Sequence, residues 1–362
     1  MSVELVEVSK VVGSETHIRS VSMKLDPGSL NVLLGPTLSG KTSLMRLMAG
    51  LDEPTSGRVL ANGRDVTGVP VRKRDVAMVY QQFINYPTLS VYENIASPLR
   101  VARRPKEEID REVREAAELL KITDMLQRTP LELSGGQQQR TALARALVKG
   151  ADLVLLDEPL ANLDYKLREE LREELPRVFS ESGTVLVYAT TEPTEALLLG
   201  GNTATLHEGA VTQFGPTLEV YRRPHDLLTA QVFSDPPMNL LKVDLQGGQV
   251  RLPDGSFVPA TGLLQSLSEG AYTLGMRPHH LYLERPSDSA LEVMTEVSVT
   301  EITGSESFVH VSYSAERWVV LAHGVQDLAA GDRLAVHIDP GRLFVFGPDE
   351  QLVASPAMQA AA

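Results

Sequence analysis

Short apolar runs alternate with segments of helical spacing from the start of the chain to about residue 235. The run Leu30–Leu34 predicts a buried strand, which leads through a glycine-rich turn into a predicted helix, Lys41–Ala49. Ala151–Leu156 and Thr184–Ala189 predict two further buried strands. Strands that alternate with helices in this way indicate an α/β fold, with a parallel sheet covered on both faces.

Two longer helices are predicted by apolar side chains that recur on one face. The first begins at Pro105, a favourable opening residue, and carries Ile109, Val113, Ala116 and Leu120. The second follows Asp164, which suits the N-cap position, and carries Leu167, Leu171, Leu175 and Val178.

The pattern changes after the Pro236-Pro237 pair. Gly247-Gly248 and Asp254-Gly255 separate short runs in the manner of hairpin turns. Further short strands are predicted at Val293–Ile302, Phe308–Tyr313, Arg317–Leu321, Leu334–Ile338 and Leu343–Phe346. Their close spacing indicates an all-β barrel of the OB type over residues 236–353, after a first domain of residues 1–235. Residues 354–362 are expected to form a loose tail.

Composition restricts the classes of function. The chain has 362 residues, 43% hydrophobic and 22% charged, as in a globular protein of two or three domains. A net charge of -13 argues against a nucleic-acid partner, which would favour a basic surface. Cysteine is absent, and the first ten residues do not resemble a signal peptide. The apolar runs are too short to span a bilayer, so a cytoplasmic location is expected and any membrane role would act through a partner.

A phosphate-binding loop is predicted between the first strand and its helix. The residues Gly35-Pro36-Thr37-Leu38-Ser39-Gly40-Lys41-Thr42 match the pattern G-x-x-x-x-G-K-[ST], and Ser43 follows in the first turn of the helix. Backbone N–H groups of such a loop surround phosphate oxygens, and the helix N-terminus adds its positive end. Lys41 would reach the β- and γ-phosphates, and the Thr42 hydroxyl would bind Mg²⁺. The loop therefore predicts ATP and Mg²⁺ as cofactors.

Two carboxylates follow the second buried strand. Asp157 ends the apolar run Leu153–Leu156, and Glu158 comes next. An aspartate at the carboxyl end of a parallel strand would lie beside the phosphate loop, where it could hold Mg²⁺. Glu158 could accept a proton from the attacking water. A carboxylate pair after a strand is more often a helix cap, but the phosphate loop upstream favours catalysis.

A third motif, Leu133-Ser134-Gly135-Gly136-Gln137, lies between these two. A serine and two glycines that open a helix can bind an anion. In this order and spacing the three motifs resemble the ABC ATPase family, for which LSGGQ is the diagnostic signature. The resemblance implies that the signature of one subunit, here Ser134, Gly135, Gly136 and Gln137, closes on the γ-phosphate held by another subunit. It also implies a P-loop ATPase domain with a helical subdomain at about residues 85–150.

Further segments match the same family. Gln81 matches the Q-loop glutamine, which senses the γ-phosphate and contributes to the metal shell. Ala161-Asn162-Leu163-Asp164 matches the D-loop, so Asp164 is counted with the nucleotide-binding residues. Tyr86–Ile95 resembles the segment that touches the coupling helix of the permease.

Two later segments, Pro236–Asn239 and Gly275–Pro278, resemble the carbohydrate-uptake branch, the maltose and glycerol-phosphate type. This branch implies a C-terminal OB-like regulatory domain of the TOBE type. It also implies two transmembrane permease subunits, a periplasmic solute-binding protein that acts indirectly, and a peripheral position on the cytoplasmic face of the inner membrane. The motif set resembles the paired ATPases of polyol importers, which favours glycerol as the solute.

Three residues depart from the family pattern. Thr191 stands where the family has its switch histidine, and one threonine hydroxyl cannot easily bridge the γ-phosphate to Glu158. Val12 stands where relatives place the aromatic residue that stacks on adenine, so only apolar packing is expected there. Leu38 replaces a residue of the phosphate loop that is usually glycine.

Two functions remain open. The chain is either an importer ATPase or a degenerate nucleotide-binding subunit whose role is structural or regulatory. The resemblance implies that each ABC site is composed of residues from two subunits. A second, non-identical ATPase that carries the histidine would therefore give one site of normal activity and one of weak activity. A homodimer is the alternative. ABC ATPases of DNA repair or translation are disfavoured by the acidic charge and the C-terminal barrel.

Overall fold

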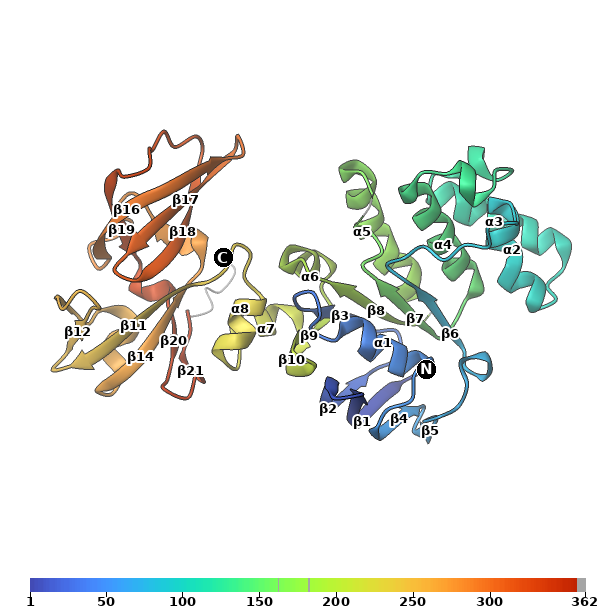
Figure 1. Cartoon of the computed structure of the whole chain (residues 1–362), viewed down its shortest axis with the longest axis horizontal. Helices are drawn as coiled ribbons and strands as arrows, with labels where there is room; N and C mark the ends of the chain where they lie inside the picture. Colours follow the sequence, from blue (N-terminus) through green and yellow to red (C-terminus); the bar gives the residue numbers. More distant parts are fainter. Residues whose placement is uncertain (162, 182, 357–362) are drawn as a thin grey trace. The chain divides into compact units, whose positions relative to one another are not determined.

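The computed structural model describes residues 1–161, 163–181 and 183–356 of the chain. By their internal contacts the residues form two compact units, Met1–Thr217 and Leu218–Ala362 (Figure 1). The predicted domain boundary near residue 235 lies after the helices α7 (Thr217–Arg222) and α8 (Leu227–Val232), and α8 belongs to the second unit. None of the helices in the described part of the chain is long and apolar enough to cross a bilayer.

A six-stranded sheet organises the first unit, with the strand order β10-β9-β3-β8-β7-β6. Its strands are β3 (Leu30–Leu34), β6 (Val76–Val79), β7 (Leu153–Asp157), β8 (Val185–Thr190), β9 (Asn202–His207) and β10 (Ala210–Pro216). Neighbours are parallel except β9 and β10, which form an antiparallel hairpin. Every residue of β7 and β8 is buried, because both faces of the sheet are covered. The predicted α/β class is confirmed.

One face of this sheet is covered by a helix and by a second, antiparallel sheet. Helix α1 (Lys41–Ala49) packs between it and a four-stranded antiparallel sheet that the sequence analysis did not anticipate. That sheet comprises β1 (Val3–Val12), β2 (Glu15–Leu25), β4 (Ser56–Ala61) and β5 (Arg64–Asp65). Several register shifts interrupt the pairing of β1 with β2 and β4, so apolar residues do not keep a period of two along these strands.

Helices α2 (Val91–Val101), α3 (Lys106–Leu119) and α4 (Gly135–Lys149) pack against one another beyond the sheet. The buried face of α3 carries Ile109, Val113 and Ala116, as its spacing predicted. Helices α5 (Tyr165–Glu181) and α6 (Pro193–Leu199) contact each other, and α6 packs on β3 and β8.

The second unit is built from two antiparallel sheets around one core, in orders β13-β12-β11-β14-β20-β21 and β15-β19-β16-β17-β18. The first sheet comprises β11 (Asn239–Gln246), β12 (Gln249–Arg251), β13 (Phe257–Pro259), β14 (Gly270–Met276), β20 (Phe344–Phe346) and β21 (Leu352–Ala354). The second comprises β15 (Leu281–Tyr282), β16 (Leu291–Ile302), β17 (Glu306–Tyr313), β18 (Glu316–His323) and β19 (Arg333–Ile338).

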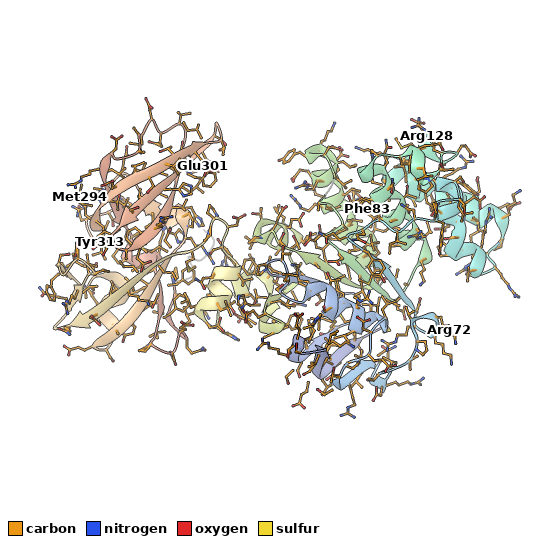
Figure 2. All side chains as sticks on the ribbon, in the orientation of Figure 1. Arg72, Phe83, Arg128, Met294, Glu301 and Tyr313 are labelled. Atoms are coloured by element: carbon orange, nitrogen blue, oxygen red, sulfur yellow. The ribbon has the colours of Figure 1, made fainter. Side chains whose placement is uncertain are left out.

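Polar contacts join the two sheets of this unit. The Asn239 side chain donates to the Val319 carbonyl (2.9 Å) and accepts from the Val319 N–H (2.7 Å). The indole N–H of the fully buried Trp318 donates to the Leu240 carbonyl at 2.9 Å. Figure 2 shows Tyr313 and Met294 on the second sheet, and the Tyr313 ring lies 5.2 Å from that of Trp318. The predicted all-β, barrel-like class of this part of the chain is confirmed.

Candidate nucleotide-binding site

The phosphate loop joins β3 to α1, and two of its glycines are required by its geometry. A Cβ atom on Gly35 would collide with the carbonyl oxygen of Leu206 and would lie 2.6 Å from the Ser39 hydroxyl. Gly40, the N-cap of α1, has a φ of 103°, which side chains rarely adopt. The loop can therefore turn tightly between the strand and the helix, and the N-terminal N–H groups of α1 face the turn.

Lys41 is held inside this loop. Its Nζ donates to the carbonyl oxygens of Gly35 (2.7 Å) and Pro36 (3.0 Å), and only 5% of the residue is exposed. Burial lowers the pKa of Lys41, and the carboxylates of Glu158 and Asp157 oppose that shift. Among the described residues the buried Ser39 hydroxyl has no hydrogen-bond partner. A buried cation and an unpartnered hydroxyl in one loop fit the oxygens of a phosphate group.

Leu38 is almost fully exposed to solvent. Its φ is 68°, in the left-handed region that favours glycine, and 95% of the residue is exposed. The leucine therefore leaves the interior of the loop open, although its backbone conformation is strained.

Thr42, in the first turn of α1, contacts Asp157, the last residue of β7. The Thr42 hydroxyl donates to the Asp157 carboxylate at 2.7 Å. Asp157 is 3% exposed, and burial raises its pKa, while Thr42 and Lys41 lower it. A hydroxyl and a carboxylate are oxygen ligands that suit Mg²⁺, which usually keeps several waters and binds through one or two carboxylates plus phosphates. The pair therefore fits a Mg²⁺ ion, and the exposed Gln81 side chain adds an amide oxygen nearby.

Glu158 is placed by several backbone contacts. Its φ is 47°, its N–H donates to the Ala189 carbonyl at 3.0 Å, and its carbonyl accepts from the Gln139 amide at 3.4 Å. The Gln81 amide donates to its carboxylate at 2.9 Å. Burial raises the pKa of Glu158, with smaller increases from Asp157 and Glu195, whereas Lys41 and Gln81 lower it. A raised pKa makes a carboxylate a better general base.

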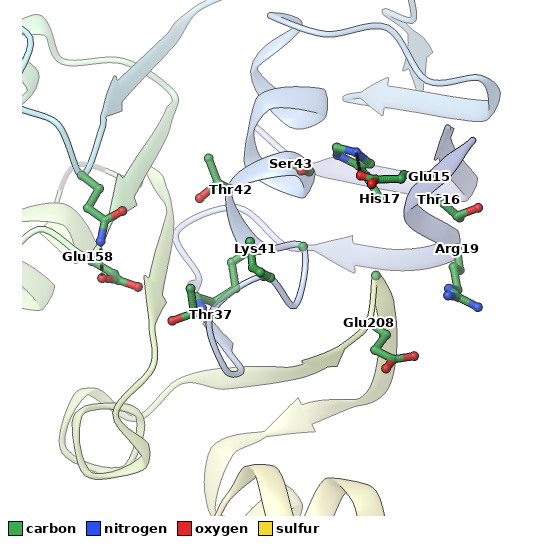
Figure 3. Close-up of a pocket in the computed structure, with 14 residues that line it drawn as sticks. Glu15, Thr16, His17, Arg19, Thr37, Lys41, Thr42, Ser43, Glu158 and Glu208 are labelled. Atoms are coloured by element: carbon green, nitrogen blue, oxygen red, sulfur yellow. Dashed lines mark hydrogen bonds and ion pairs between the residues drawn. The ribbon is translucent and has the colours of Figure 1, made fainter. Parts of the chain in front are cut away.

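Lys41, Thr42, Gln81 and Glu158 line one cleft of about 670 Å³ (Figure 3). Among the residues predicted from the sequence, it is lined by Thr37, Leu38, Gly40, Lys41, Thr42, Ser43, Gln81 and Glu158. Six further lining residues were not predicted: Glu15, Thr16, His17, Arg19, Glu208 and Gly209. They come from β2 and from the β9–β10 turn, and they belong to no motif. Only their pairing in space brings them to the loop, so the sequence carried no local signal for them.

Four predicted residues that are not among the described lining residues still belong to the loop or contact it: Gly35, Pro36, Ser39 and Asp157. The other predicted residues lie elsewhere. Val12, at the end of β1, is 51% exposed and is not among the lining residues that the structure describes. Thr191 is exposed just after β8. Asp164 caps α5, because its carboxylate accepts from the Leu167 N–H at 3.0 Å. Asn162 of the D-loop lies outside the described residues.

The signature motif begins a helix. Ser134 is the N-cap of α4, and its N–H donates to the Gln137 side chain at 2.9 Å in a capping box. Ser134 and Gly135 are exposed, Gly136 and Gln137 are half-buried, and none of the four is among the described residues that line the cleft. The nucleotide contacts predicted for Val12, Asp164 and the signature remain predictions.

Comparisons with known proteins agree with this geometry. Residues 18–161 match the family model described as ABC transporter, and residues 274–346 match that of the TOBE domain. The trehalose/maltose import ATP-binding protein MalK of Thermococcus litoralis is 35% identical, with 95% of this chain and 97% of the relative covered. The sn-glycerol-3-phosphate import ATP-binding protein UgpC of Paracoccus denitrificans is 36% identical, with 94% and 96% covered. The chain belongs to the ABC transporter family.

A solved ABC cassette shows the same fold in the first unit. A dimeric ATP-binding cassette in a post-hydrolysis state, bound to ADP and Pi, is 28% identical and matches with a TM-score of 0.55. The match covers 59% of this chain and 98% of the cassette. This ABC ATPase therefore binds ATP and is an ATPase.

In this ABC ATPase, Lys41→Ala should abolish tight ATP binding, because the variant removes the buried cation that faces the phosphates. We expect the melting temperature to change by only a few degrees, since the side chain contacts the loop rather than the apolar core. Equilibrium binding of a fluorescent ATP analogue checks the affinity. Lys24→Ala is the matched control, since Lys24 is a mostly exposed lysine that pairs with Asp26. Unchanged affinity in Lys41→Ala would show that the phosphates bind elsewhere.

Proposed function

We propose that this chain hydrolyses Mg-ATP at the cleft described above and drives a membrane permease that imports a small sugar or polyol. The observation that carries the proposal is the convergence of the Thr42–Asp157 and Gln81–Glu158 pairs at one end of a cleft whose wall is a phosphate loop. Oxygen ligands, a general base and a buried cation are the groups that phosphoryl transfer to water requires.

The roles of the residues follow from their contacts. Lys41, Ser39 and the N–H groups of the loop hold the phosphates. Thr42, Asp157 and Gln81 would hold Mg²⁺, which, when bound, neutralises part of the phosphate charge. Glu158 takes the proton of the attacking water, helped by its raised pKa. Gln81 donates to the Glu158 carboxylate and so orients it toward the end of the cleft.

The site is completed by a second ATPase subunit. The signature residues Ser134, Gly135, Gly136 and Gln137 open α4 away from the cleft of their own chain. An exposed helix N-terminus is suited to bind the γ-phosphate held by another copy or by a non-identical partner. The solved cassette bound to ADP and Pi is dimeric, which supports a paired arrangement.

A permease contact is proposed at the segment around Tyr86. Ile84 and Tyr86 are 57% and 52% exposed, although both are large and apolar. The buried Asn94 amide fixes this segment by accepting from the Tyr86 N–H (2.7 Å) and donating to the carbonyls of Tyr86 (3.0 Å) and Leu89 (3.1 Å). An ordered apolar surface of this kind fits a helix of a permease subunit. The chain would then sit at the cytoplasmic face of the inner membrane.

The transported solute is proposed to be a small polyol or sugar, with glycerol favoured. Relatives are named for trehalose and maltose, sn-glycerol 3-phosphate, and, in Haloferax volcanii, xylose and arabinose.

Purification of the native complex should yield two permease subunits with this chain. Its ATPase rate in liposomes should rise when the periplasmic binding protein carries glycerol, and less so with maltose. A complex that contains no permease would refute the importer proposal.

A second candidate function rests on Thr191. The backbone turn that carries it is held by its neighbours, since the Thr190 hydroxyl donates to Glu195 (2.6 Å) and accepts from the Glu192 N–H (3.0 Å). Thr191 itself offers one short hydroxyl where the family has a histidine. If that hydroxyl fails to position the γ-phosphate, this chain contributes its signature to a partner and its own site turns over slowly.

Thr191→His should therefore raise the ATPase rate of the purified chain by about 10²–10³-fold, the usual effect of one positioned donor. Mixing the wild-type chain with a histidine-bearing ATPase subunit should restore turnover at the site that borrows Ser134 and Gly136. Steady-state phosphate release measures both effects. Thr194→His is the matched control, because Thr194 is an exposed threonine of the same segment. If the wild type already turns over as fast as Thr191→His, the slow-site hypothesis is wrong.

A further inference from the structure

The nucleotide can lie in the cleft in one direction only. Hydrolysis places the γ-phosphate beside Glu158, so the adenosine must extend past the phosphate loop toward the other end. In Figure 3 the side chains of Glu15, His17 and Arg19 lie on one side of the phosphate loop, and Glu158 lies on the other. The end that β2 lines is therefore where the base should bind.

His17 carries the one aromatic ring among the described residues that line the cleft. Its side chain is 38% exposed, so part of the ring surface is open to a ligand. The Glu15 carboxylate lies 3.7 Å from the imidazole Nε2, at the edge of the ring. By contrast, Val12 is at the end of β1 and is not among those lining residues.

The backbone that carries His17 is fixed to the phosphate loop. The Gly209 N–H donates to the Ser39 carbonyl at 2.9 Å, and the Arg19 N–H donates to the Gly209 carbonyl at 2.8 Å. A Cβ atom on Gly209 would lie 2.5 Å from the His17 carbonyl oxygen, and one on Gly40 would lie 3.0 Å from it. These close approaches tie the position of the histidine to that of the phosphates, which is the preorganisation that a base-binding residue needs.

We propose that the imidazole of His17 is the surface on which the adenine of ATP stacks, in place of the aromatic residue that the sequence lacks at position 12. The inference rests on the proposed nucleotide site and adds the residue that binds the base. A planar π system can stack on any base, so His17 contributes affinity for the nucleoside and none for the phosphates. Glu15 orients the ring.

Binding of ATP, GTP and inorganic tripolyphosphate to the wild type and to three variants tests the proposal. His17→Ala should weaken ATP binding by about 5- to 100-fold, the range for loss of one base–aromatic contact, and leave binding of inorganic tripolyphosphate unchanged. His17→Phe, which keeps a ring but loses the pairing with Glu15, should retain the wild-type affinity for ATP. Val12→Ala tests the alternative base contact on the same hairpin and should bind ATP like the wild type. GTP should follow ATP in each variant.

The outcomes separate this inference from the proposed site. Wild-type ATP affinity in His17→Ala would overturn it, and so would weaker ATP binding in Val12→Ala alone. Equal losses of ATP and tripolyphosphate in His17→Ala would also overturn it, because they would mean damage to the phosphate loop. Failure of the site itself would appear differently, as undiminished tripolyphosphate binding in Lys41→Ala. Melting temperatures of all variants confirm that each is folded.

Discussion

The hydrogen bond between Thr42 and Asp157 depends on one constraint, the parallel order of β3, β8 and β7. Leu34 pairs with Thr190, and Ala189 pairs with Asp157, so the carboxyl ends of the three strands meet at one edge of the sheet. The phosphate loop follows the first of these strands, and Asp157 ends the third. Residues 115 positions apart in sequence can therefore form a hydrogen bond beside the loop.

β8, which lies between β3 and β7, forms backbone hydrogen bonds to both the phosphate loop and Glu158. The Thr190 carbonyl accepts from the Gly35 N–H (3.4 Å) at the start of the loop, and the Ala189 carbonyl accepts from the Glu158 N–H (3.0 Å). The strained backbone of Glu158 is thus held by contacts outside its own turn. The same strand ends at Thr190, and Thr191 follows it directly, so a substitution of Thr191 leaves these backbone contacts of β8 in place. Burial lowers the pKa of Lys41 and raises the pKa of Asp157, which favours the neutral form of each group, whereas the opposite charge of the other residue favours the ionised form.

Much of this arrangement could be predicted because its signals are local. The loop motif, the strand before Asp157 and the α1 helix each occupy a few consecutive residues with a fixed chemistry, and the short strands after residue 236 are bounded by their turns. The antiparallel sheet of β1, β2, β4 and β5 could not be predicted, because register shifts break its alternation. His17 and Gly209 reach the cleft only through pairing between distant segments. The family resemblance therefore predicts the base contact at Val12, whereas His17, and not Val12, is among the described residues that line the cleft.

The most direct test of the central claim is the Mg²⁺ dependence of nucleotide affinity in the wild type and in Asp157→Asn. Asparagine keeps an oxygen to accept from Thr42 and loses the charge that a metal ion needs. With a non-hydrolysable ATP analogue, Mg²⁺ should tighten binding to the wild type, and this enhancement should be lost in Asp157→Asn while the affinity without Mg²⁺ is kept. An equal enhancement in both proteins would contradict the account, because Asp157 would then not belong to the metal shell.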